Sequence, residues 1–109
     1  MLQIHTRLCA TFASGKTLPF EYRRAQLLGL ARMMQENVDA LLGALYADFG
    51  KHKFESNMPE IGVIIKSSIT AANSVEEWMK PDKPQVEEWR SSYNTTVHKV
   101  PKGTVVNIS

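Results

Sequence analysis

The sequence predicts a mostly α-helical fold that ends in two β-strands. Apolar residues recur every three or four positions over Leu27–Phe49 and again over Ile61–Met79, which is the spacing of one face of a helix. After Pro84 the pattern changes, and residues 93–100 and 104–109 are rich in β-branched side chains, which favour strands. The chain has 109 residues, enough for at most one ordinary domain.

A first short helix is predicted over the opening residues. Ile4, Leu8 and Phe12 recur at helical intervals, and Gly15 follows as a typical helix-ending residue. Cys9 falls on the same pattern, which indicates a small apolar packing residue. A nucleophilic cysteine needs a neighbouring base and an electropositive pocket, and we expect neither near this position.

The longest helical pattern follows Pro19. A proline in the first turn of a helix loses no hydrogen bond, because its missing N–H would have no partner there. The apolar stripe Leu27–Phe49 then runs to Gly50, so the sequence predicts either one amphipathic helix or two helices joined near Glu36-Asn37. Leaving this stripe in water would forfeit on the order of ten kcal/mol, so we expect it to be covered.

The next helix is expected to start at Ser56 or Asn57. Both are favourable N-cap residues, Pro59 would lie in the first turn, and Glu60 stands at the capping-box distance from Asn57. The apolar face Ile61–Met79 follows. The prolines beyond it end the helix, since the residue before a proline is driven out of helical space.

The carboxyl-terminal part is predicted to be extended. Residues 81–92 contain two prolines and mostly polar side chains, as a linker does. Residues 93–100 form the first expected strand, and residues 104–109 form a second one that is apolar enough for the interior of a sheet. Trp78 and Trp89 are expected to pack, because no basic groove accompanies them as in a nucleic-acid stacking platform.

Composition excludes several classes of protein. The 13 basic and 11 acidic residues leave a net charge of +2, too small to predict nucleic-acid binding. The longest nearly apolar stretch, Ala40–Ala47, is too short to span a bilayer. A single cysteine excludes an internal disulfide and fits a reducing compartment, so we expect a cytoplasmic location.

The first twenty residues leave a second location open. They include Arg7 and Lys16, several hydroxyl side chains and no acid before Glu21, a composition similar to that of a mitochondrial transit peptide. An ordinary short helix ending at Gly15 is the interpretation that the sequence favours. The mitochondrion is therefore the alternative location.

No group of residues predicts a reaction. Gly15-Lys16-Thr17 is similar to the end of a phosphate-binding loop, but Ala10 stands where that loop needs a glycine, and no strand precedes it. His5, His52 and His98 are far apart and lack the paired short spacing of zinc ligands. The sequence therefore predicts no catalytic residue and no metal site.

Several short motifs occur in a characteristic order along the chain: Phe12-Ala13-Ser14-Gly15-Lys16-Thr17, Arg23-Arg24-Ala25-Gln26-Leu27, Ala47-Asp48-Phe49-Gly50-Lys51, Pro59-Glu60-Ile61, and Lys99-Val100-Pro101-Lys102-Gly103-Thr104-Val105-Val106. In this order and spacing they resemble the amino-terminal region of the class 3, or fatty, aldehyde dehydrogenases. Each motif is weak alone, and together they cover nearly the whole chain and make the resemblance specific.

The resemblance implies the α/β fold of that family, of which this chain would supply the beginning. Residues 1–80 would be the helical part of the nucleotide-binding domain, and residues 81–92 would be a proline-containing linker. Residues 93–100 would form a strand of the oligomerisation region. Residues 104–109 would form the first, incomplete strand of the nucleotide-binding sheet.

The resemblance also implies a reaction that this chain is expected not to perform alone. Members of the family oxidise fatty or other apolar aldehydes to carboxylic acids with NAD or NADP, through a thioester on a cysteine. The nucleophilic cysteine, the general-base glutamate and most of the cofactor site have no counterpart here, and only Ile108 and Ser109 would border the cofactor pocket. We therefore expect an inactive fragment, truncated before the catalytic machinery, that binds no cofactor tightly.

The expected partners follow from the same resemblance. Besides the aldehyde of the family, they are a second copy of the chain, in a homo-oligomer, or a full-length dehydrogenase subunit. A second class of function stays open, a non-catalytic helical module that uses its apolar stripes to bind a partner protein. No nucleic-acid partner and no transmembrane segment are expected.

Overall fold

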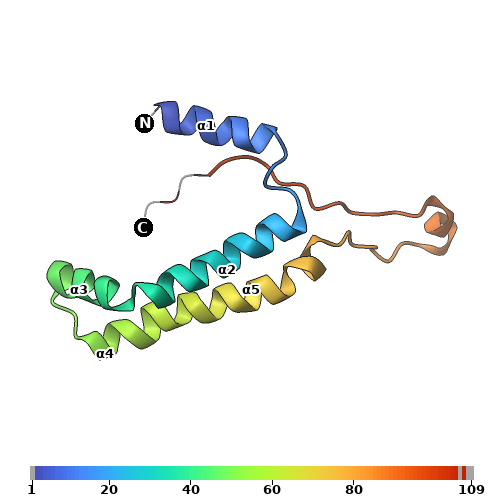
Figure 1. The fold of residues 1–109 in the computed structure, drawn as a ribbon. Coiled ribbons are helices and arrows are strands. Elements are labelled where there is room, and N and C mark those ends of the chain that lie inside the picture. Colours follow the sequence, from blue (N-terminus) through green and yellow to red (C-terminus); the bar gives the residue numbers. More distant parts are fainter. Residues whose placement is uncertain (1, 106, 108–109) are drawn as a thin grey trace. The chain divides into compact units, whose positions relative to one another are not determined.

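A computed structural model describes residues 2–105 and 107 and shows a helical protein (Figure 1). The chain divides into two compact units. We call residues 20–75 the helical unit, and residues 1–19 together with 76–109 the flanking unit. The described elements are α1 (Leu2–Ala13), α2 (Phe20–Glu36), α3 (Val38–Phe49), α4 (Lys53–Ser56), the π-helix η1 (Asn57–Gly62), α5 (Val63–Met79) and the 3-10 helix η2 (Glu88–Tyr93).

The long apolar stripe forms two helices, α2 and α3, joined at Asn37, which confirms the second of the two predicted alternatives. The Asn37 amide nitrogen Nδ2 donates a hydrogen bond to the Met33 carbonyl oxygen at 2.8 Å, and the Asn37 carbonyl accepts from the Leu41 amide at 3.0 Å. α3 ends at Gly50, whose φ of 64° lies in the left-handed region. Its N–H donates to the Tyr46 carbonyl, so the predicted glycine stop is confirmed.

The helix after Gly50 begins earlier than predicted. His52 is the N-cap of α4, and its Nδ1 accepts a hydrogen bond from the Phe54 amide at 3.3 Å. The predicted N-cap at Ser56 or Asn57 is therefore wrong, since both residues lie within continuous helical structure. The Ser56 hydroxyl is fully buried and finds no hydrogen-bond partner among the described residues.

Pro59 explains why the helix widens to a π-turn rather than starting afresh. A proline has no N–H to donate to the carbonyl four residues earlier, so the regular α-helical ladder is interrupted there. The backbone passes through η1 and resumes as α5. Gly62 closes this turn tightly, because a Cβ at this position would lie 3.2 Å from the Asn57 carbonyl oxygen.

The core of the helical unit gathers where these helices meet. Figure 1 shows α2 and α5 running antiparallel. Met34 of α2, Leu42 of α3 and Ile61 of η1 form a buried cluster, against which Val38 and Ile65 pack. The predicted burial of the apolar stripes is thus confirmed only in part, since other stripe residues such as Phe49 and Trp78 are exposed. Ile61, with 1% of its surface exposed, is the most deeply covered apolar side chain of the core.

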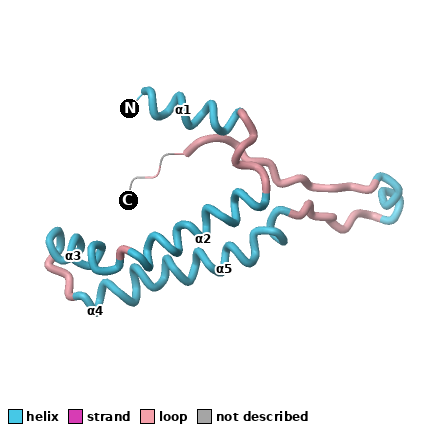
Figure 2. Tube along the Cα trace, viewed as in Figure 1, coloured by secondary structure: helices cyan, strands magenta, loops and turns pink. Residues whose placement is uncertain are grey.

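The predicted carboxyl-terminal strands are wrong for the described residues. Tyr93 lies in the 3-10 helix η2, and residues 94–105 form no strand (Figure 2). A single antiparallel bridge joins Asp82 to Val97, with N···O distances of 3.0 and 2.8 Å. Pro81 and Pro84 flank Asp82 and supply no N–H, so the ladder has too few donors to extend. Residues 106, 108 and 109, including part of the second predicted strand, lie outside the described residues.

Candidate functional site

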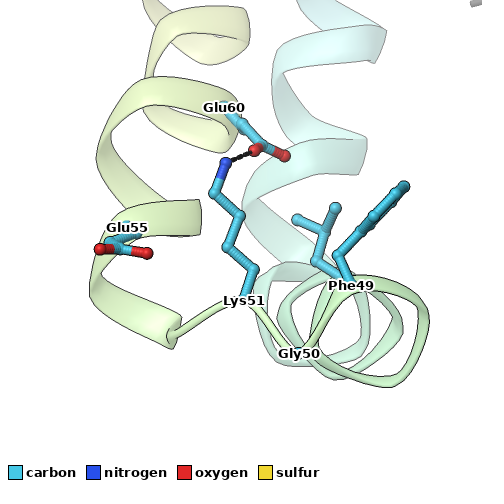
Figure 3. Close-up of a pocket in the computed structure, with 6 residues that line it drawn as sticks. Phe49, Gly50, Lys51, Glu55 and Glu60 are labelled. Carbon is cyan, nitrogen blue, oxygen red and sulfur yellow. Dashed lines mark hydrogen bonds and ion pairs between the residues drawn. The ribbon is translucent and has the colours of Figure 1, made fainter.

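One hollow lies in the helical unit, at the corner where α3 ends and η1 begins (Figure 3). It has a volume of about 470 Å³ and is open to solvent. Lys51 extends from the loop after α3 and forms an ion pair with Glu60 of η1. The residues that line the hollow are Leu45, Phe49, Gly50, Lys51, Glu55 and Glu60.

The ion pair determines the electrostatics of this hollow. The Lys51 and Glu60 side chains are each about one-third exposed, at 35% and 36%, so solvent screens their attraction and the pair contributes about 1 kcal/mol or less. It ties the end of α3 to the π-turn across nine positions of sequence. The charges neutralise each other, and Glu55 adds one further negative charge at the edge.

An apolar groove adjoins the hollow and shares Leu45 and Glu60 with it. The groove has a volume of about 270 Å³, and the buried cluster residues Met34 and Ile61 lie in its lining. Asp48 stands in the lining as a second acid. Such a groove accepts apolar side chains, and no cysteine, serine or threonine lines the groove or the hollow.

The first helix contains a pair that sequence reasoning missed. Cys9 Sγ lies 3.5 Å from Nε2 of His5, one turn earlier on α1, so the expectation that no base lies near Cys9 is wrong. A spacing of four residues on a helix was the signal that predicts this contact. Cys9 is half-buried, His5 is exposed, and neither lines a described pocket, so the pair lacks the enclosed oxyanion site that acyl chemistry needs.

The remaining histidines have structural or solvated positions. His52 caps α4, and His98 is exposed. Among the described residues no group of three or more histidine, cysteine, aspartate or glutamate side chains is arranged to hold a metal ion. Gly15 has φ of 72° and turns the chain after α1 rather than opening a phosphate-binding loop, because a helix and not a strand precedes it.

Both tryptophans are exposed, so the prediction that they pack is wrong. Trp78 is 56% exposed and Trp89 62%. The Trp89 ring carries the Arg90 guanidinium 4.3 Å from its centroid and meets Tyr93 edge-on at 6.4 Å between centroids. The sequence analysis placed residues 81–92 in a linker and Tyr93 in a strand, so the 3-10 turn that brings the two rings together was not predicted.

The charged residues of the flanking unit make local pairs. Arg90 lies 3.7 Å from Glu87, and Lys99 Nζ lies 2.8 Å from an oxygen of Asp82. The Glu77 carboxylate accepts a hydrogen bond from the Lys80 amine at 2.6 Å. This hydrogen bond and the negative charge of Glu77 raise the pKa of the Lys80 amine above its ordinary value. These pairs are solvent-exposed and stabilise little.

The residues expected to border a cofactor, Ile108 and Ser109, lie outside the described residues. The described residues do not fit a dinucleotide, because none of their segments forms the strand, glycine-rich turn and helix that cradle a pyrophosphate. No helix described in the structure is both long and apolar enough to cross a bilayer.

Comparison with known proteins finds several aldehyde dehydrogenases that are similar to this chain. It is 32% identical over 99 residues to aldehyde dehydrogenase family 3 member F1 of Arabidopsis thaliana, a match covering 91% of this chain and 20% of that protein. It is 35% identical over 103 residues to family 3 member B1 of Bos taurus, covering 94% and 22%. A dimeric NADP-preferring aldehyde dehydrogenase of Rattus norvegicus is 29% identical over 97 residues, covering 89% and 21%.

These matches show that the chain is similar to a segment of aldehyde dehydrogenases. Within that class the chain is homologous to a segment of the family 3 enzymes, which confirms the resemblance drawn from its motifs. The chain spans about a fifth of the length of these curated relatives. No protein-family model and no solved structure matches it significantly.

Proposed function

We propose that this chain is the amino-terminal segment of a family 3 aldehyde dehydrogenase and is catalytically inactive by itself. The observation that carries the proposal is the coverage, since about nine-tenths of this chain matches only about a fifth of each relative. Residues 1–80 supply helices of the nucleotide-binding domain, residues 81–92 a linker, and residues 93–100 part of the oligomerisation region. The complete enzyme acts on fatty or other apolar aldehydes with NAD or NADP in the cytoplasm, with the mitochondrion as the alternative location.

The exposed apolar side chains of the helical unit support this proposal. At the corner formed by α3, α4 and η1, Phe49 is 79% exposed, and Tyr46, Phe54 and Met58 are more than half exposed. Large exposed apolar patches are uncommon on soluble monomers and indicate a surface that another protein body covers. The helices therefore have the surface expected of one layer of a larger fold.

A direct assay tests the proposed inactivity. The purified chain is incubated with an apolar aldehyde and NAD or NADP, and formation of the reduced cofactor is followed by absorbance. We expect no turnover above the rate without protein, because Cys9 and His5 lie on an open helix surface with no bound-aldehyde site around them. Turnover that disappears in Cys9→Ser would contradict the proposal.

The apolar groove of the helical unit favours a second candidate function, a helical module that binds a partner protein such as a dehydrogenase subunit. The relative described as dimeric makes a second subunit a reasonable partner. Transcripts distinguish the two functions. In the family that the chain resembles, the strand matching residues 104–109 runs directly into a Pro-Trp-Asn-Tyr-Pro motif. A continuation beyond the Ser109 codon into that motif favours the enzyme segment, whereas a stop codon at that position in independent transcripts favours the module.

A further inference from the structure

Helix α1 combines an uncovered apolar ridge with a basic flank. Ile4 is 64% exposed and Leu8 46%, and none of the described residues of α1 is buried. Arg7 and Thr11 line a shallow hollow of about 150 Å³ together with Ile4 and Leu8, so the Arg7 guanidinium lies beside the apolar ridge. We call Ile4, Leu8, Arg7 and Thr11 the α1 face.

Helix α1 is expected to need a packing partner for its apolar side to be stable. An isolated helix of about 12 residues is marginal in water, because too few hydrogen bonds offset the cost of nucleation. α1 has 12 residues and an amphipathic distribution of side chains. Its length and its exposure together indicate that the helix forms best where its apolar ridge leaves water.

The basic charge of the first twenty residues indicates which kind of surface would bind α1. The sequence up to Phe20 includes Arg7 and Lys16 and contains no acidic residue. Both basic side chains are exposed, and neither makes an ion pair with the described residues. An acid-free amphipathic helix with an uncompensated basic flank is complementary to an anionic surface that also offers an apolar layer.

We propose that the α1 face docks on an anionic lipid bilayer, with Ile4 and Leu8 entering the interface and Arg7 and Lys16 among the headgroups. Binding is weak and reversible, because only two fully charged side chains and a short ridge take part. This interaction is independent of the proposed enzyme segment, since it uses α1 and neither the corner at Phe49 nor the apolar groove.

Vesicle flotation of the full chain tests the proposal. The chain is mixed with phosphatidylcholine vesicles, or with vesicles in which about one-third of the lipid is phosphatidylglycerol. We expect several-fold more bound protein on the anionic vesicles, and loss of most of this excess when salt rises from about 0.05 M to about 0.5 M. Equal binding to both vesicles, or none at the highest lipid concentration, would overturn it.

Two variants and a matched control locate the contact. Leu8→Glu places a negative charge on the ridge and should lower the partition coefficient at least tenfold, and Arg7→Gln should lower it about fivefold, as expected for one basic residue near an anionic membrane. The matched control is Leu30→Glu on α2. Leu30 is 40% exposed, and this variant should leave the partition coefficient unchanged. Circular dichroism checks that each variant keeps its helices, and Arg7→Gln tests the charge without disturbing the ridge.

Sedimentation without lipid separates this proposal from protein association. If the chain forms a dimer that Leu8→Glu dissociates, then the α1 face is an interface between copies and the lipid proposal is wrong. A chain that stays monomeric while Leu8→Glu and Arg7→Gln both weaken vesicle binding supports it. Unchanged vesicle binding in both variants would also contradict it.

Discussion

The helical unit and the carboxyl-terminal part of the flanking unit differ in how they satisfy their backbones. Helices α2, α3 and α5 form their hydrogen bonds within themselves, and Met34 of α2, Leu42 of α3 and Ile61 of η1 form a buried cluster. Residues 80–105 are nearly all exposed and share one β-bridge. A helix needs a partner only for its apolar face, whereas a strand also needs one for its backbone. The difference shows which parts of such a chain form structure on their own.

Hydrogen exchange measures this difference most directly. We expect amides between Ile65 and Val75 to exchange at least about 1,000-fold more slowly than in an unstructured peptide, because opening them requires unfolding of the helical unit. Amides of residues 98–105 should exchange within about tenfold of the unstructured rate. The Val97 amide, which donates to Asp82, should exchange more slowly than the Val100 amide. Comparable protection in both regions would contradict the comparison.

The buried cluster is the most sensitive part of the helical unit. Ile61→Ala removes a side chain that is 1% exposed and should lower the free energy of unfolding by about 2–5 kcal/mol, from lost burial and the cavity left behind. Ile69→Ala, on α5 at a position 39% exposed, is the matched control and should cost less than about 1 kcal/mol. Urea denaturation followed by circular dichroism gives both values, and equal losses would show that Ile61 is not the centre of the core.

Ser56, which was wrongly predicted as an N-cap, is a position where a substitution should raise the stability of the helical unit. Ser56→Ala removes a buried hydroxyl that has no described partner, so it should raise the free energy of unfolding by about 1 kcal/mol or somewhat more. Ser67→Ala, at an exposed position on α5, should change stability by less than about 0.5 kcal/mol. A loss of stability in Ser56→Ala would indicate a hydrogen bond to the Ser56 hydroxyl.

Local patterns predicted the helices because helical contacts lie three or four residues apart. The periodicity allowed a break near Glu36-Asn37 as one of two alternatives, and Gly50 predicted the stop, which the structure confirms. The start of the next helix was missed because Pro59 suggested a first turn, whereas the chain passes through it as a π-turn. The two strands were predicted wrongly, because β-branched residues only favour a strand and the partner that completes a ladder is not encoded nearby.

The candidate site was less predictable than the fold. The contact of Cys9 with His5 joins residues four apart on a predicted helix, so spacing could have found it, whereas that of Trp89 with Tyr93 depends on a 3-10 turn that was not predicted. The ion pair of Lys51 with Glu60 spans a loop, a cap and the π-turn, and no regular spacing predicts it. Short motifs in order predicted the resemblance to family 3 aldehyde dehydrogenases, because sequence similarity extends over about nine-tenths of the chain and does not depend on any one contact.

Two glycines of the helical unit test the smallest effects, with opposite expected signs for the same substitution. Gly50→Ala places a Cβ on a residue with φ of 64° and should lower the free energy of unfolding by about 1 kcal/mol, since only glycine adopts this conformation without strain. Gly43→Ala lies within α3 where nothing obstructs a Cβ, and it should raise stability by about 0.5–1 kcal/mol. Because both substitutions add one methyl group, hydrophobicity cancels, and changes of the same sign would show that α3 does not end at Gly50.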